Sequence, residues 1–75
     1  MSVRVYRSLS EAEAGIVESL LRANGFHPED ILQSVHAFLG GTDPNYYVEV
    51  PEHEAHGARK LLNTFKVENV MESDD

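Results

Sequence analysis

The stretch YYVEVP at residues 46–51 decides the fold. β-Branched and aromatic side chains of this kind favour extended structure, and Pro51 ends the run because it has no amide hydrogen to donate to a sheet. Side chains alternate along a strand, so Tyr47 and Glu49 lie on one face and Val48 and Val50 on the other. We therefore predict a strand with one face in the core.

A second strand is predicted near the N-terminus, over residues 3–7 (VRVYR), with Val3 and Val5 facing inward. If the two strands are neighbours, their outward side chains form an amphipathic patch that the chain itself leaves uncovered. This predicted interface consists of Arg4, Tyr6, Tyr47 and Glu49. Tyrosine is enriched at protein interfaces, so a second copy or another protein is the expected partner. The alternative is a solvated face with a weak Arg4–Glu49 pair.

The first of two predicted helices begins near Glu11, because Ser10 and Glu13 form a capping box, and it ends at Asn24-Gly25. Its apolar face is predicted from the 3.6-residue spacing of Ala12, Ile16, Val17, Leu20, Leu21 and Ala23.

The second helix is predicted to start at Pro51, with Glu52 and Glu54 in its first turn, where negative charge is favourable. Its apolar face is predicted to contain Ala55, Ala58, Leu61, Leu62 and Phe65.

Four segments remain. Residues 66–71 are predicted to form a short last strand, residues 40–45 a turn or loop, and residues 72–75 an acidic disordered tail after a single domain at 1–71. Residues 28–39 are ambiguous, since Pro28 and apolar residues at helical spacing favour a helix, whereas the turn at Gly25 favours a strand. We prefer a strand over part of this range, and a helix there would indicate a helix-rich adaptor.

The predicted order is strand, helix, strand, strand, helix, strand. Two helices with one apolar face each are most easily buried on one side of an antiparallel sheet. The expected fold is therefore α+β, a ferredoxin-like βαββαβ two-layer sandwich with both helices on one face.

Composition excludes several classes of protein. The 75 residues suffice for one small core, and association with another copy would add to its low stability. The absence of cysteine excludes disulfides and thiolate metal sites. Thirteen acidic residues against six basic ones give a net charge of −7, which argues against nucleic acid and anionic membranes as partners. Without an apolar leader or membrane-spanning run, we expect a cytoplasmic protein.

The pattern resembles a family of small bacterial signal-transducing proteins known as domain of unknown function 2007. The resemblance covers about residues 3–62 and is carried by the first strand, the helix leading to Asn24-Gly25-Phe26, the Gly40-Gly41 loop, and the run from Tyr47 to Leu62. That family is distantly similar to the nitrogen-regulatory signalling proteins, which have a ferredoxin-like core, form trimers and bind effectors. The resemblance implies a regulatory role. This chain departs from those regulators in having no long loop between the second and third strands and no basic cluster for a nucleotide phosphate.

The sequence offers little chemistry beyond binding. His53 and His56 are three residues apart and would be neighbours on a helix, but no third ligand is placed beside them, so they are weak candidates for a metal site. No nucleophile has a base at a known catalytic spacing, so we expect neither an enzyme nor a cofactor. The leading hypothesis is a non-enzymatic regulatory module that self-associates or binds a protein or small-molecule effector. The alternatives are a His-dependent metal protein and the helix-rich adaptor.

Overall fold

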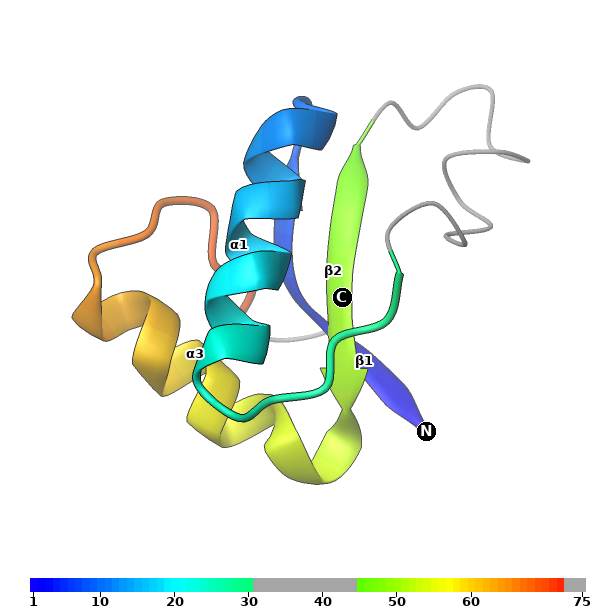
Figure 1. The fold of residues 1–75 in the computed structure, drawn as a ribbon, viewed down its shortest axis with the longest axis vertical. Helices are drawn as coiled ribbons and strands as arrows, with labels where there is room; N and C mark the ends of the chain where they lie inside the picture. Colours follow the sequence, from blue (N-terminus) through cyan, green and yellow to red (C-terminus); the bar gives the residue numbers. More distant parts are fainter. Residues whose placement is uncertain (31–44, 73–75) are drawn as a thin grey trace.

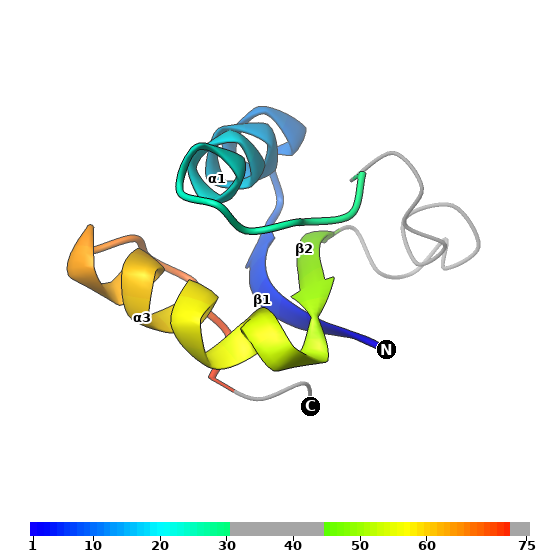
Figure 2. The same ribbon diagram turned by 60° about the horizontal axis from the view of Figure 1, so that its bottom comes forward.

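The computed structural model describes residues 1–30 and 45–72. Along the chain lie strand β1 (Ser2–Ser8), helix α1 (Glu11–Ala23), strand β2 (Tyr46–Pro51), the 3-10 turn η2 (Glu52–Glu54) and helix α3 (Ala55–Thr64), as Figure 1 shows. The two strands pair antiparallel, and both helices lie on one side of them (Figure 2). These residues therefore form a small α+β domain, with β1 and β2 neighbours as predicted.

A β-bulge in β1 changes which side chains face the core. Arg4 lies opposite Glu49 and Tyr6 lies opposite Val48, so Val5 is an extra residue between the two pairs. An extra residue breaks the two-residue alternation, and every side chain beyond it changes face. Val5 and Tyr6 are consequently both buried, at 0% and 4% exposure. The prediction that Tyr6 points away from the helices is wrong.

Helix α1 has the predicted ends. The Ser10 hydroxyl accepts a hydrogen bond from the Glu13 amide at 3.2 Å, and Gly25 adopts a φ of +90° just after the helix. The reciprocal half of the capping box is absent from the described contacts, since the Glu13 carboxylate instead accepts a hydrogen bond from Ser8 at 3.3 Å. The helix is thus anchored to the end of β1 as well as capped.

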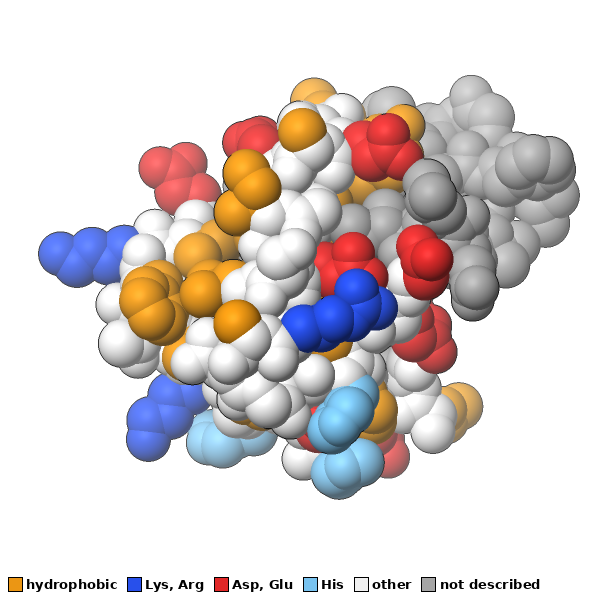
Figure 3. Space-filling view, in the orientation of Figure 1, with side chains coloured by type: hydrophobic (Ala, Val, Ile, Leu, Met, Phe, Trp, Pro, Cys, Tyr) orange, Lys and Arg blue, Asp and Glu red, His pale blue; other side chains and the backbone are white. Residues whose placement is uncertain are grey.

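The buried stripe of α1 is narrower than predicted and turned around the helix axis. It consists of Ala14, Val17 and Leu21, while Ala12, Ile16 and Ala23 are exposed. One helix face can contact a sheet over only part of its circumference, and the predicted apolar arc was wider than that. In Figure 3, hydrophobic side chains are accordingly visible on the outer surface over α1.

Helix α3 follows the turn η2, so the helical path after β2 starts with a 3-10 turn and Pro51 itself remains in the strand. Ala55, Ala58 and Leu62 are buried as predicted, and they join Val48 and Val50 in the core. Phe65 is 56% exposed, contrary to the prediction. It lies beyond the last helical residue, and Lys66 then turns the chain with a φ of +59°.

The predicted strand at residues 66–71 is reduced to a single antiparallel bridge between Val70 and Tyr6. The Met71 amide donates to the Val5 carbonyl at 2.8 Å, so the chain does return to β1 on the side away from β2. Positive φ angles at Lys66 and Asn69 prevent a continuous strand because an extended chain needs negative φ. The predicted strand is therefore not formed over its whole length, although its end pairs with β1.

Residues 26–30 have no helical structure, so the predicted helical alternative does not begin at Pro28. The Glu29 amide donates to the Glu49 carbonyl at 2.9 Å, which places this segment along the second edge of β2. The rest of the ambiguous range, residues 31–39, lies outside the described residues, as do the predicted loop up to residue 44 and the tail at 73–75.

Candidate ligand-binding groove beside α3

A groove among the described residues runs along α3 and is lined by no residue of α1. Its volume is about 850 Å³. Helical spacing brings His56, Lys60 and Asn63 to one wall, with Arg59 beside them, because residues three and four apart share a helix face. Val3 and Ala55 contribute apolar surface, and Glu52 and Glu72 complete the acidic part of the lining. We call this surface the α3 groove.

Arg59 has an unsatisfied hydrogen-bond donor. One of its terminal nitrogens, Nη2, donates to the Arg4 carbonyl of β1 at 2.8 Å. Its Nε is buried and has no hydrogen-bond partner within the described ranges. A buried N–H without an acceptor costs free energy, so native structures usually satisfy such groups with protein, water or ligand. Because Nε is enclosed by protein, a ligand in the α3 groove would contact Arg59 through the exposed part of its side chain.

The formal charges of the α3 groove cancel, unlike those of the whole chain. Arg59 and Lys60 oppose Glu52 and Glu72, whereas the chain carries −7. One carboxylate is already engaged, since Glu72 accepts a hydrogen bond from Asn63 at 3.1 Å. A small anion therefore meets less repulsion here than over the acidic remainder of the surface. The groove suits a polar molecule with an acidic group.

These residues were missed at the sequence level, where no basic cluster was noted. The signal is present in the spacing: His56, Arg59, Lys60 and Asn63 follow the i, i+3, i+4, i+7 pattern of one helix face.

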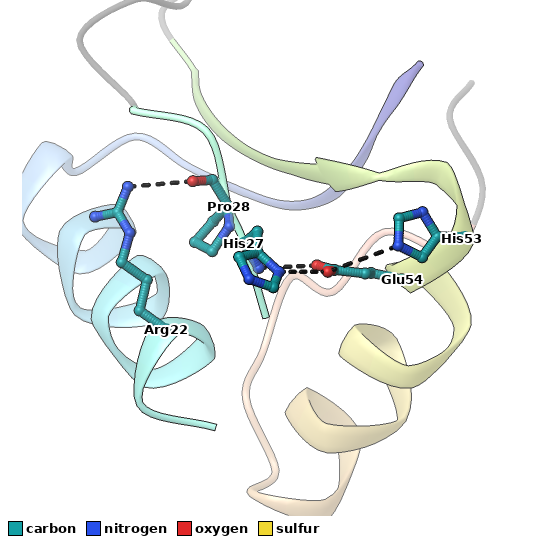
Figure 4. Close-up of polar contacts among 5 residues, drawn as sticks. All are labelled: Arg22, His27, Pro28, His53 and Glu54. Carbon is teal, nitrogen blue, oxygen red and sulfur yellow. Dashed lines mark hydrogen bonds and ion pairs between the residues drawn. The ribbon is translucent and has the colours of Figure 1, made fainter. Parts of the chain in front are cut away.

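A second polar cluster joins residues 26–30 to the start of α3 (Figure 4). Glu54 accepts a hydrogen bond from the His27 amide at 2.8 Å, and its other oxygen lies 2.6 Å from Nδ1 of the His27 ring. These two contacts hold the pKa of Glu54 below its ordinary value of 4.5 because they stabilise the carboxylate. From the other side, Arg22 donates to the Pro28 carbonyl at 3.1 Å. The segment is therefore held from both helices.

The two histidines proposed as weak metal candidates occupy different surroundings. His53 lies in η2 with its Nε2 3.9 Å from a Glu54 oxygen, and His56 lines the α3 groove. Within residues 1–30 and 45–72, no group of three or more His, Cys, Asp or Glu side chains could hold a metal ion. The His-dependent metal site stays the weaker alternative.

The structure brings together three of the four residues of the predicted interface. Arg4 lies 3.7 Å from Glu49, and its guanidinium carbon is 4.2 Å from the centre of the Tyr47 ring. Tyr6 is on the opposite face, in the core, as the bulge requires. Tyr47 is buried, and Arg4 and Glu49 are half-buried, so the open patch that the sequence suggested is not found. A partner contact through Arg4, Tyr47 and Glu49 stays a prediction.

Comparisons with protein-family models, with curated proteins and with solved structures found no match for this chain. The resemblance to the signal-transducing family therefore stays a prediction from the sequence. Among the described helices, none has the length and apolar character needed to cross a membrane.

Proposed function

We propose that this chain is a non-enzymatic regulatory module that binds a small anionic effector in the α3 groove and acts in the cytoplasm. The observation that carries the proposal is the set of Arg59, Lys60 and His56 along one wall of this groove, in a chain of net charge −7. A carboxylate or phosphate oxygen would accept hydrogen bonds from these side chains, and hydrogen bonds between charged groups are among the stronger ones.

The groove also suggests how binding would be transmitted. Arg59 already bonds to the Arg4 carbonyl, which directly precedes the bulge in β1. A ligand that binds the same guanidinium would therefore contact a side chain that belongs to α3 and is hydrogen-bonded to the sheet. This link between a ligand site and the core is what a signalling module requires, and it agrees with the role that the family resemblance implies.

The complete fold in this proposal is the ferredoxin-like βαββαβ sandwich. Its support is that β1 lies between β2 and the bridge at Val70, and that the Glu29 amide bonds to the outer edge of β2. Both are the neighbour relationships that this topology demands.

A thermal-shift titration tests the proposed function. Inorganic phosphate, succinate and glutamate serve as probes, because a ligand that binds only the native state raises its melting temperature. We expect at least one of them to raise the melting temperature of the wild type and to do so much less in Lys60→Gln.

The matched control is Lys66→Gln, which removes the same charge from a lysine outside the groove. Its response should equal that of the wild type. An equal loss in both variants would show that the probes respond to net charge alone, and the proposed site would be wrong.

A further inference from the structure

The outer surface of the helical layer carries apolar side chains that the fold does not bury. Ile16 is 69% exposed and Phe65 is 56% exposed. Leu20, Leu61 and Val67 pack against the core and are only partly covered. Figure 3 shows hydrophobic side chains over α1 and extending to the side where α3 ends. We call Ile16, Leu20, Leu61, Phe65 and Val67 the helix-layer patch.

Two shallow grooves flank this patch and differ in charge. The first is lined by Ile16, Val17 and Val67 together with the carboxylates of Glu13 and Glu68. The second, near the end of α1, is lined by Phe26 and Leu61 together with the cation of Lys60. The patch therefore has an acidic end and a basic end, with apolar surface between them.

We propose that the helix-layer patch is the contact between two copies of this chain, related by a twofold axis. A twofold axis sets the same patch against itself in the reverse direction, so the acidic end of one copy meets the basic end of the other. Apolar surface at the centre and opposite charges at the rim are the usual composition of a protein interface. The small core of a 75-residue chain also leaves stability to be gained by association.

The helical layer fits this role better than the face predicted from the sequence. Among the described residues of the sheet side, Tyr47 is buried and Arg4 and Glu49 are half-buried, so these three side chains leave little apolar surface to cover. On the helical side, Ile16 and Phe65 expose most of their surface and sit at positions where polar residues would cost the monomer nothing. A contiguous group of exposed apolar residues, unlike a single one such as Leu9, indicates a partner that covers it.

Sedimentation velocity over a concentration series tests the proposal. The wild type should convert from monomer to dimer as concentration rises, and Ile16→Ser and Phe65→Ser should each raise the dissociation constant by about tenfold or more. Both side chains are exposed, so each variant should keep the wild-type circular dichroism spectrum. Leu9→Ser is the matched control, because Leu9 is 72% exposed and lines neither groove, and its dissociation constant should be unchanged.

Charge reversal tests the arrangement of the two copies. Glu68→Lys and Lys60→Glu should each weaken the dimer, and the double variant should restore it, since the pair is merely exchanged across the axis. Any of three results would overturn the proposal. The wild type could stay monomeric at every concentration, or Leu9→Ser could raise the dissociation constant as much as Ile16→Ser does. The third is a double variant that dimerises more weakly than both single variants. Repeating the phosphate, succinate and glutamate titrations on Ile16→Ser separates this proposal from the proposed function. Ile16 does not line the α3 groove, so this variant should respond to the probes as the wild type does.

Discussion

Tyr6 lies opposite Val48 across the β1–β2 ladder, although a regular strand would have paired Val5 with that residue. The bulge puts an aromatic ring into the core beside the helices, next to the small side chain of Val5. The inner face of β1 therefore supplies more apolar volume than its alternating sequence suggests.

Removing this ring should be among the most damaging single changes. Tyr6→Ala is expected to lower the free energy of unfolding by about 3–5 kcal/mol, the range for deleting a large buried aromatic side chain. Urea unfolding followed by circular dichroism measures the loss. Arg7→Ala, at an exposed neighbouring position, should stay within about 0.5 kcal/mol of the wild type. Equal losses at the two positions would contradict the inward orientation of Tyr6.

The cap of α1 gives a second prediction. Ser10→Ala removes the acceptor for the Glu13 amide and should cost about 1 kcal/mol of stability. Ser19→Ala changes the same side chain on the exposed surface of the same helix, where alanine has the higher helix propensity. Thermal unfolding should therefore show a lower melting temperature for the first variant only. If Ser10→Ala lowered the melting temperature no more than Ser19→Ala does, the cap would have no energetic value.

Two glycines in helices should respond differently to alanine. A Cβ at Gly15 would meet no atom within 4 Å, so Gly15→Ala should stabilise the protein by about 0.5–1 kcal/mol through helix propensity. A Cβ at Gly57 would lie 3.1 Å from Cε1 of Phe26, so the ring would have to shift. We expect Gly57→Ala to gain less than Gly15→Ala or to lose stability, as denaturant titration of the pair would show. A larger gain at Gly57 would mean that Phe26 moves freely.

The Glu54–His27 contact predicts a pH dependence of stability. The pKa of Glu54 is lowered in the folded state, so its contribution is present above the unfolded value near 4.5 and is lost as pH falls through the lowered pKa. Wild type and Glu54→Gln should therefore differ in stability at neutral pH and converge in acid.

Carbon-detected NMR titration of the Glu54 carboxyl checks this assignment directly. His27→Gln removes the ring, which is the main cause of the lowered pKa, and should move that pKa back towards its ordinary value. An unchanged pKa in this variant would show that the ring contact is not responsible.

Features of the fold that depend only on residues close together in the sequence could be predicted. Ser10, Glu13 and Gly25 define α1 because capping and left-handed backbone are local properties. The adjacency of β1 and β2 also follows, because two half-buried strands must share a sheet. The bulge at Val5 does not, since an alternating VRVYR run has no local mark of an inserted residue.

The sites were harder to predict than the elements. Pairing of Arg4 with Glu49 was foreseen because it depends on strand register alone. The approach of His27 to Glu54 depends on how residues 26–30 cross the start of α3, which tertiary packing decides. The exposure of Ile16 likewise depends on how far α1 is turned on the sheet.

The position of β1 has a consequence for the time course of folding. Tyr6 pairs with Val48 on one side and with Val70 on the other, so among the described residues β1 pairs with segments that are synthesised much later than itself. Contacts of such high sequence separation slow the search for the native state. On the ribosome, β1 therefore emerges before the residues that pair with its two edges.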